Sequence, residues 1–268
     1  MVRTLLIRGM FVGLLAGLLV FAFGKFFGEP QVDRAIGFET ALDEAKAKAE
    51  EAKGIRVEKE PELVSRRVQA GWGLFTGVVV YSSAFGGLFG LVFAAAHRRA
   101  VDLGPRATSA LLATVGFVSI YVIPNLKYPA NPPSVGEPET IGYRTALYFS
   151  MLALSVAAMV LASMLRKRLV ARRGGWAAAL IAIAFYLAAM IVVGSLLPAI
   201  NEVPEAFPAV VLWHFRVASF GMQLVMWTTL GLVFGTLTER AWAKDQLSLR
   251  SSVQLGDTST RRRSRASG

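Results

Sequence analysis

The 268-residue sequence has no cysteine and only two histidines, His97 and His214. Disulfides, thiolate metal sites and cysteine nucleophiles are therefore excluded, and two histidines cannot form a multi-histidine metal site within one chain. The sequence also lacks a Gly-x-x-x-x-Gly-Lys-Ser/Thr phosphate loop and a His-Glu-x-x-His zinc motif. An enzyme is thus the weakest interpretation, and any ATP coupling would have to come from another chain.

Charge is missing from six long stretches of the sequence. Five of them contain no Asp, Glu, Lys, Arg or His, and the first contains only Lys25. A soluble amphipathic helix would have a charged face, and about 20 apolar residues span a bilayer. The sequence therefore predicts an all-α, polytopic helical membrane protein with about six transmembrane helices. The predicted spans are residues 9–27, 68–96, 107–126, 145–165, 175–201 and 217–238.

The positions of the basic residues explain the net charge of +11 better than nucleic-acid binding does. They gather before the first span, between spans two and three, between spans four and five, and after the last span. Examples are Arg3, Arg8, Arg98, Arg99, Arg106, Arg166, Lys167, Arg168, Arg172, Arg173, Arg240 and Lys244. By the positive-inside rule, both termini are predicted to be cytoplasmic, and the protein is expected to be a multi-pass plasma-membrane protein.

The chain divides into a membrane domain, residues 1–240, and a basic tail, residues 241–268. The tail is predicted to be disordered and to lie near anionic headgroups, because it contains Arg261, Arg262, Arg263 and Arg265. The first span lacks an A-x-A cleavage site near Phe21–Gly28. It is therefore interpreted as a retained anchor helix rather than a signal peptide.

Three connections are predicted to lie outside the membrane. The first, residues 28–67, is an exposed charged loop in which residues 38–53 favour a solvated helix. The second, Pro124 to Arg144, contains five prolines and is predicted to have no regular helix. The third extends from Leu197 through Pro208 to Arg216. The polar chemistry of the chain is expected in these three connections.

Two short patterns recur along the chain. The second and third outside loops both end in aromatic-Arg-x-Ala, as Tyr143-Arg144-Thr145-Ala146 and Phe215-Arg216-Val217-Ala218, which suggests duplicated hairpins around a shared site. Glycines recur at a spacing of four within the spans, which predicts seams of close helix packing. They are Gly9, Gly13 and Gly17; Gly73 and Gly77; Gly86 and Gly90; and Gly231 and Gly235.

Three motifs resemble a known family. They are Gly28-Glu29-Pro30-Gln31-Val32-Asp33-Arg34-Ala35, then Lys127-Tyr128-Pro129-Ala130-Asn131-Pro132-Pro133 with Thr140-Ile141-Gly142-Tyr143-Arg144, and Leu197-Pro198-Ala199-Ile200-Asn201-Glu202-Val203-Pro204. Together they resemble the CbtA family of cobalt-transporter subunits over nearly all of residues 1–240. The resemblance implies transport of Co²⁺ to supply cobalamin synthesis, beside a small membrane subunit of the CbtB type. Some relatives have histidines in the first outside loop, but residues 28–67 here contain none.

Divalent cobalt accepts imidazole nitrogen and carboxylate oxygen, and the span interiors offer neither. Any metal ligands are therefore predicted at the outer mouth. The candidates are Glu29, Asp33, Glu137, Glu139, Asn201, Glu202, Glu205 and His214. Asn201 and Glu202 are the first choice because they lie between Pro198 and Pro204, where free backbone carbonyls are expected.

Each of these candidates has a structural alternative. Glu202 would pair with Arg144 or Arg216 and stabilise the loop, and His214 would be a neutral histidine in an aromatic belt beside Trp213. Met222 and Met226 are interpreted as apolar filler rather than a Cu(I) site.

The sequence thus predicts the membrane subunit of a divalent-cation transporter with no resident cofactor and Co²⁺ as cargo. The lipid bilayer and a small partner subunit are the expected partners, and self-association into a homo-oligomer remains an alternative. The rival function is a non-transporting membrane scaffold, which the absence of ionisable residues in the spans favours.

Overall fold

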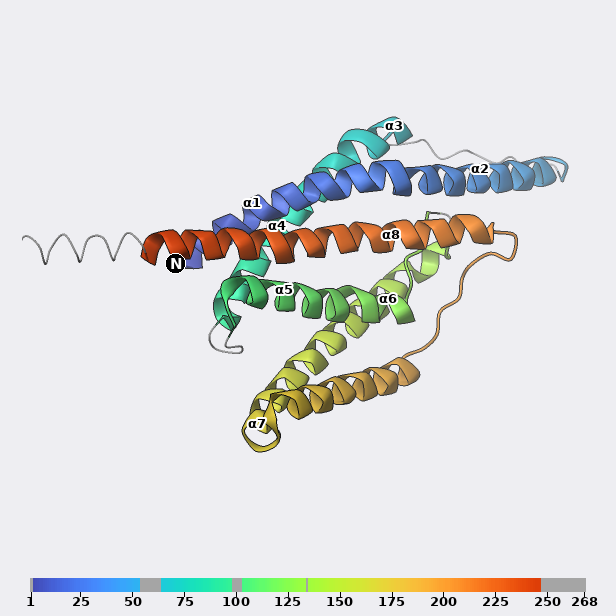
Figure 1. The fold of residues 1–268 in the computed structure, drawn as a ribbon. Helices are drawn as coiled ribbons and strands as arrows, with labels where there is room; N and C mark the ends of the chain where they lie inside the picture. The colour runs from blue at the N-terminus through green and yellow to red at the C-terminus, as the bar shows by residue number, and fades with distance from the viewer. Residues whose placement is uncertain (1, 54–63, 98–102, 134, 247–268) are drawn as a thin grey trace, which may run out of the picture.

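The computed structural model describes residues 2–53, 64–97, 103–133 and 135–246. Its elements are helical, as the sequence predicts, and no β-strand forms within these ranges (Figure 1). The α-helices are α1 (Val2–Phe23), α2 (Glu29–Glu51), α3 (Arg66–Val68), α4 (Leu74–Ala96), α5 (Pro105–Gly116), α6 (Ile123–Lys127), α7 (Ile141–Leu196) and α8 (Ala209–Thr229). Short π-helical segments η1 (Gly24–Gly28), η2 (Gln69–Gly73), η3 (Phe117–Val122) and η5 (Leu230–Phe234) join or extend them, and η4 (Pro138–Thr140) is a 3₁₀ turn.

These elements assemble into five helical rods that are long and apolar enough to cross a membrane. They are Val2–Glu51, Arg66–Ala96, Pro105–Lys127, Pro138–Leu196 and Ala209–Gln246. Each of the six predicted spans lies on one of these rods, except that the fifth was predicted to continue to Asn201, whereas α7 ends at Leu196.

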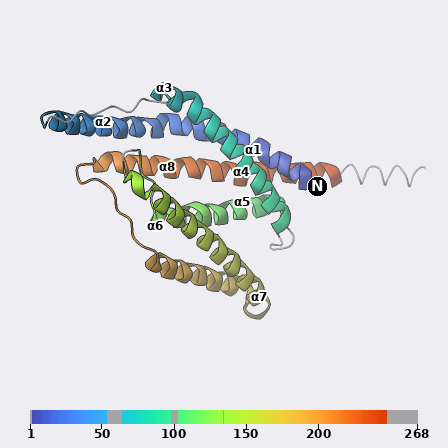
Figure 2. The same cartoon turned by 180° about the vertical axis from the view of Figure 1, so that it is seen from behind.

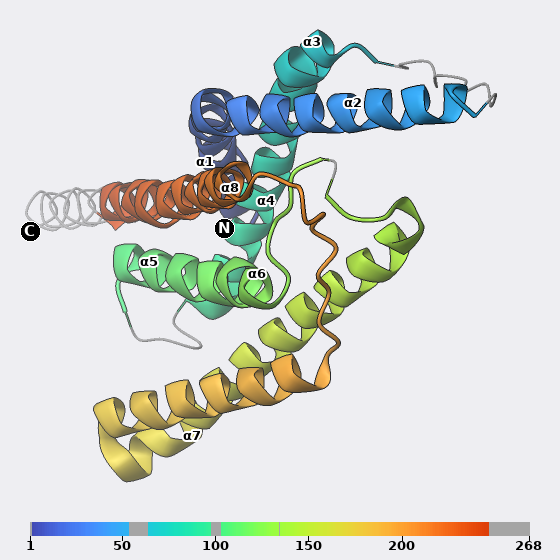
Figure 3. The same cartoon turned by 90° about the vertical axis from the view of Figure 1, so that its right-hand side faces the viewer.

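The predicted spans at 145–165 and 175–201 both fall on α7. Gly174 interrupts this helix with φ 77° and ψ 165°, a backbone conformation that glycine adopts readily because it has no Cβ. The two arms of α7 fold back beside each other at this point (Figures 1 and 3). Arm one is residues 141–173, and arm two is residues 175–196.

The first outside connection differs from the prediction of a loop over residues 28–67. The helix of the first rod continues without a break from η1 into α2 and ends only at Glu51. Pro30 does not interrupt it: it is the second residue of α2 and directly follows the π-helical segment η1, and local π adjustments of this kind accommodate a proline within a helix. The predicted exposed helix therefore begins at Glu29 rather than Phe38.

The third outside connection is also shorter than predicted. The irregular segment ends at Pro208 and α8 begins at Ala209, so His214 and Arg216 lie on a helix and not in a loop. At the other end, the rod is helical to Gln246, which corrects the predicted boundary of the basic tail at residue 241. The basic residues 261–265 lie outside the described residues.

The closest helix packing in the bundle is a glycine seam between α1 and α4 (Figure 2). A Cβ on Gly9 would overlap the carbonyl oxygen of Gly86, and a Cβ on Gly86 would lie 2.7 Å from the Cα of Gly13. Likewise, Gly235 lies against α5, where a Cβ would be 2.8 Å from the Cβ of Ser109. These contacts confirm the predicted seams except that of Gly73 and Gly77, because a Cβ on Gly73 would meet only Val68 of the same rod and a Cβ on Gly77 would have nothing within 4 Å.

The main core lies where α1, α4, α5 and α8 meet. Its buried side chains include Phe89, Phe93, Trp227 and Phe234. Aromatic rings pack edge to face across it, with ring centroids 5.4 Å apart for Phe89 and Phe234. Met226 is buried in the same cluster and Met222 packs against it, as expected for apolar filler.

In three of the four π-helical segments, a backbone carbonyl accepts a hydrogen bond from a side chain of another rod. Lys25 Nζ donates to Ala70 O of η2 (3.0 Å), Ser155 Oγ donates to Ser119 O of η3 (2.7 Å), and Ser109 Oγ donates to Gly231 O of η5 (2.8 Å). A π-helical turn leaves carbonyls without their usual helical partner. The bonds of Ser155 and Ser109 are buried and satisfy main-chain groups where water is scarce, whereas that of Lys25 is exposed.

The α7 hairpin is attached to the rest of the bundle mainly near η3 and α6. Ser155 on arm one bonds both Ser119 O and the hydroxyl of Tyr186 on arm two, the latter at 2.8 Å. In Figures 1 to 3 the bend of α7 stands apart from α5 and α8. The hairpin thus meets the bundle at one end and diverges from it at the other.

Gly86→Ala tests the glycine seam. The added methyl group has no space against Gly9 and Gly13, so we expect a loss of about 2 kcal/mol in the free energy of unfolding. Gly77→Ala on the same helix is the matched control and should change it by less than about 0.5 kcal/mol. Reversible unfolding of the detergent-solubilised protein measures both, and equal losses in the two variants would contradict the seam.

Candidate functional site

Two proline-rich segments, residues 128–140 and 197–208, form one structure that we call the proline cap (Figure 3). They connect the α7 hairpin to α6 on one side and to α8 on the other. The hydroxyl of Tyr128 donates to Pro198 O at 2.8 Å and joins the two segments directly. For the described residues, the predicted absence of regular helix from Pro124 to Arg144 is correct only between Tyr128 and Glu137. Pro124 lies in α6, and α7 begins at Ile141, so Arg144 lies on a helix.

Glu202 is the central carboxylate of the cap. Its Oε2 accepts hydrogen bonds from the backbone N–H of Glu137 (2.9 Å) and the hydroxyl of Thr140 (2.8 Å). Arg144 Nε lies 3.3 Å from the same oxygen. The two hydrogen bonds and the charge of Arg144 lower the pKa of Glu202 below its ordinary value. The predicted ion pair is therefore confirmed, and its partner is Arg144 rather than Arg216.

Arg144 also binds the backbone of its own segment. Its guanidinium donates to Val135 O (3.4 Å) and Glu137 O (3.1 Å). Gly136, between these residues, has φ 111°, and a Cβ there would overlap the guanidinium. The sequence Val-Gly-Glu thus folds around Arg144 because only glycine combines this backbone conformation with so close an approach.

Arg216 of α8 makes the reciprocal contact with the other segment of the cap. Its Nε donates to Ala130 O (3.2 Å) and its second amino group donates to Asn131 Oδ1 (2.8 Å). The two arginines of the repeated aromatic-Arg-x-Ala pattern therefore both hold the cap. Arg144 pairs with a carboxylate, whereas Arg216 donates to a backbone carbonyl and a side-chain amide oxygen.

A small apolar cluster fastens the cap to α2. Ala35 of α2 and Val135 and Phe207 of the cap are buried together, and Phe38 packs on them with its ring centroid 5.2 Å from that of Phe207. The polar contacts of the cap thus rest on an apolar base outside the main core. α2 supports the cap because the first rod extends beyond α1 as a continuous helix.

Glu29 and Asp33 belong to a different ion-pair group. Both carboxylates bind the guanidinium of Arg66, with Asp33 Oδ1 2.9 Å from the terminal nitrogen that also contacts Glu29. Glu29 is buried and Asp33 is exposed. This group holds α2 against α3, and the single positive charge of Arg66 offsets one of the two negative charges.

The other candidate ligands are exposed and spread over the cap and its surroundings. Glu137 contributes its backbone to the contacts that hold Glu202, which we call the clasp: Glu202 with Glu137 N–H, Thr140 and Arg144. Glu139 lies in η4, and His214 lies on α8. Asn201 and Glu205 flank Glu202 in the second segment. Within the described residues, no group of three His, Asp or Glu side chains is arranged to hold a metal ion.

In the described apolar stretches of the rods, the buried polar side-chain atoms are mainly hydroxyls, together with the indole Nε1 of Trp227. The buried Ser and Thr side chains there are Ser82, Thr108, Ser109, Ser119, Ser155, Thr229 and Thr238. In the described part of the spans, no buried carboxylate or imidazole marks a cation route of the kind found in many transporters.

Sequence analysis did not identify Tyr128, Asn131 and Thr140 as residues whose hydrogen bonds hold the proline cap together. A signal was present, because Tyr128 and Asn131 belong to the Tyr-Pro-x-Asn-Pro-Pro run and Thr140 precedes α7. Their hydrogen-bond partners lie 62 to 85 residues away in the chain, so no local pattern indicates them.

Comparison with known proteins places almost the whole chain in one family. The model of a family described as "Probable cobalt transporter subunit (CbtA)" matches residues 2–239. No curated protein and no solved structure matches the chain. The matched residues include all five rods up to Glu239, the proline cap and both ion-pair groups.

Replacement of Glu202 tests the clasp through its pH dependence. Because the folded-state pKa is lowered, the clasp contributes its full stability above the ordinary glutamate pKa of about 4.3 and loses it as the pH falls through the lowered value. Glu202→Gln should therefore lower the melting temperature at pH 7, and its difference from the unmodified chain should shrink as the pH approaches 3. Glu205→Gln, an exposed neighbour in the same segment, is the control and should have little effect at any pH. A deficit of Glu202→Gln that is independent of pH would argue against the charged clasp.

Proposed function

The chain belongs to the CbtA family, and we propose on this basis that it is the membrane subunit through which a cobalt transporter moves Co²⁺ across the plasma membrane. The observation that carries the proposal is the family match over nearly the whole chain, together with five apolar rods. We also propose that this cobalt supplies cobalamin synthesis and that the chain works beside a small partner subunit of the CbtB type.

We propose six membrane crossings with both termini in the cytoplasm. The bend at Gly174 supports this count, because it divides α7 into two apolar arms that run in opposite directions. Arg166, Lys167, Arg168, Arg172 and Arg173 lie on the arm that leads to the bend, and their charge favours the cytoplasmic side. The proline cap and α2 would then lie outside.

In this topology the cap is the mouth at which cations collect. Glu137, Glu139 and Glu205 are exposed there, and Asn201 and His214 add oxygen and nitrogen donors nearby in the chain. Cobalt accepts both kinds of donor. Glu202 has a different part: its carboxylate is held by Thr140, Glu137 and Arg144 and keeps the mouth in shape.

Passage through the membrane needs ligands that the spans of this chain do not supply. Their buried polar side chains carry mainly hydroxyl groups, and several of these bond backbone carbonyls, as Ser155 does with Ser119 and Ser109 with Gly231. The partner subunit is therefore proposed to contribute ligands to the route. The same observation favours the rival function, a membrane scaffold that does not itself conduct the ion.

The topology can be tested by labelling, because the chain has no cysteine of its own. In whole cells, Lys48→Cys on α2 should react with a membrane-impermeant maleimide, whereas Arg173→Cys beside the bend should react only after permeabilisation. Both positions are exposed, so accessibility alone does not separate them. Labelling of both cysteines in intact cells would contradict two crossings by α7.

Uptake of radioactive Co²⁺ by cells expressing the chain, alone and with its small partner, tests the transport proposal. The triple variant Glu137→Gln, Glu139→Gln, Glu205→Gln should lower uptake at low ionic strength by about tenfold, because a focused negative field raises the local cation concentration. The matched control replaces three exposed carboxylates of α2, Glu44→Gln, Glu50→Gln and Glu51→Gln, and should have a smaller effect. Equal effects would remove the cap from the mechanism, and no uptake by the unmodified chain with its partner would support the scaffold.

A further inference from the structure

A small open cavity lies at the opposite end of the bundle from the proline cap. It occupies about 280 Å³ between the first turns of α1 and the end of the fifth rod. It is lined by Thr4, Leu5, Arg8, Trp242 and Asp245. No contact of the cap or of the proposed cation mouth involves these residues.

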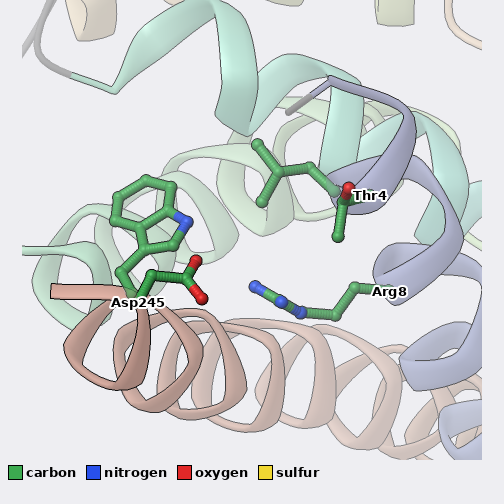
Figure 4. Close-up of a pocket in the computed structure, with 5 residues that line it drawn as sticks. Thr4, Arg8 and Asp245 are labelled. Carbon is green, nitrogen blue, oxygen red and sulfur yellow. The ribbon is translucent and has the colours of Figure 1, made fainter. Parts of the chain in front are cut away.

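Arg8 supplies an unsatisfied donor to this cavity. Its Nη1 is buried and makes no hydrogen bond with any part of the chain that the structure describes. The half-buried guanidinium loses water, the nearby charge of Asp245 offsets this cost only in part, and the Nη1 donor still lacks an acceptor. Figure 4 shows the guanidinium reaching across the cavity, with Thr4 one turn away on the same helix. The α1 wall is therefore built to bind an anionic oxygen.

The opposite wall has the complementary chemistry. Asp245 directs its carboxylate toward Arg8 in Figure 4. Trp242 lines the same cavity, and its ring is held against the ring of His97 with centroids 5.0 Å apart. A carboxylate beside an indole attracts a primary ammonium by charge, by hydrogen bonding and by contact with the aromatic face. One small cavity thus offers a positive and a negative wall.

We propose that this cavity binds the head group of phosphatidylethanolamine, an aminophospholipid. The phosphate would accept hydrogen bonds from Arg8 and Thr4, and the ammonium would bind Asp245 and Trp242. A lipid is the favoured source because the cavity lies at the end of two membrane-spanning rods, beside basic residues such as Arg3, Arg240 and Lys244. An anionic lipid would fit less well, because Asp245 opposes a second negative charge.

Native mass spectrometry of the full-length chain in detergent tests this proposal without any metal. Phosphatidylethanolamine, phosphatidylglycerol and phosphatidylcholine with identical acyl chains are added at equal concentrations. The unmodified chain should bind phosphatidylethanolamine most tightly. Because the readout is lipid binding, its failure leaves the cobalt proposal untouched, and failure of cobalt uptake leaves this site untouched.

Variants of the two walls have different expected results. Arg8→Gln should weaken phosphatidylethanolamine binding about tenfold, the usual worth of a charge-assisted hydrogen bond. Asp245→Asn should abolish the preference over phosphatidylglycerol while still binding a phosphate. Arg3→Gln and Lys244→Gln remove basic residues near the cavity that do not line it, and both should bind lipid as the unmodified chain does.

Three further results have defined meanings. Displacement of the lipid by soluble phosphoethanolamine would support the same head-group chemistry with a soluble source, and resistance to displacement would support the lipid. Tighter binding of phosphatidylglycerol by the unmodified chain, unchanged in Asp245→Asn, would overturn the proposal in favour of simple attraction to basic residues. If Arg8→Gln fails to fold, as judged by its circular dichroism, Asp245→Asn still decides the outcome.

Discussion

A backbone carbonyl in a bilayer has no water to bond, and this constraint explains much of how the rods are joined. Four rods contain a π-helical segment, and in three of those segments a neighbouring helix donates to a carbonyl: Lys25 to Ala70, Ser155 to Ser119, and Ser109 to Gly231. Each bond satisfies a main-chain group and fixes the register of two rods. Several polar contacts between the rods thus satisfy the backbone, beside side-chain pairs such as Ser155 with Tyr186.

The same scarcity of polar groups leaves close packing as the main cohesive force between α1, α4, α5 and α8. In lipid, helices associate through close contacts that small residues permit, and the seam from Gly9 to Gly86 provides such a contact. The α7 hairpin lacks a comparable seam with the bundle and depends on Ser155, on apolar contacts near η3, and on the proline cap. Its position is therefore coupled to the cap, because both connections to the hairpin pass through it.

Sequence reasoning succeeded where one physical effect dominates. Apolar length predicted the rods, glycine spacing predicted the seams at Gly9 and Gly86, and charge complementarity predicted an ion pair for Glu202. It failed where local signals compete. Pro30 was predicted to lie in a loop but is the second residue of α2, and His214 was predicted to lie in a loop although α8 begins at Ala209. The π-helical segments have no sequence signature, and the partners of Arg216 are set by tertiary contacts alone.

The distribution of charge constrains how such a chain can take part in cation transport. At the cap, Glu202 is held by Arg144 and stabilises the contact between the two segments, whereas Glu29 and Asp33 are held by Arg66 and join α2 to α3. The exposed carboxylates of the cap can attract a cation, but attraction at a mouth does not replace a hydration shell inside the membrane. Residues that do so must be polar and face the route. The buried polar side chains of the described spans carry mainly hydroxyl groups, and none of them is a carboxylate or an imidazole. A chain of this composition agrees with a family whose members are subunits of a transporter.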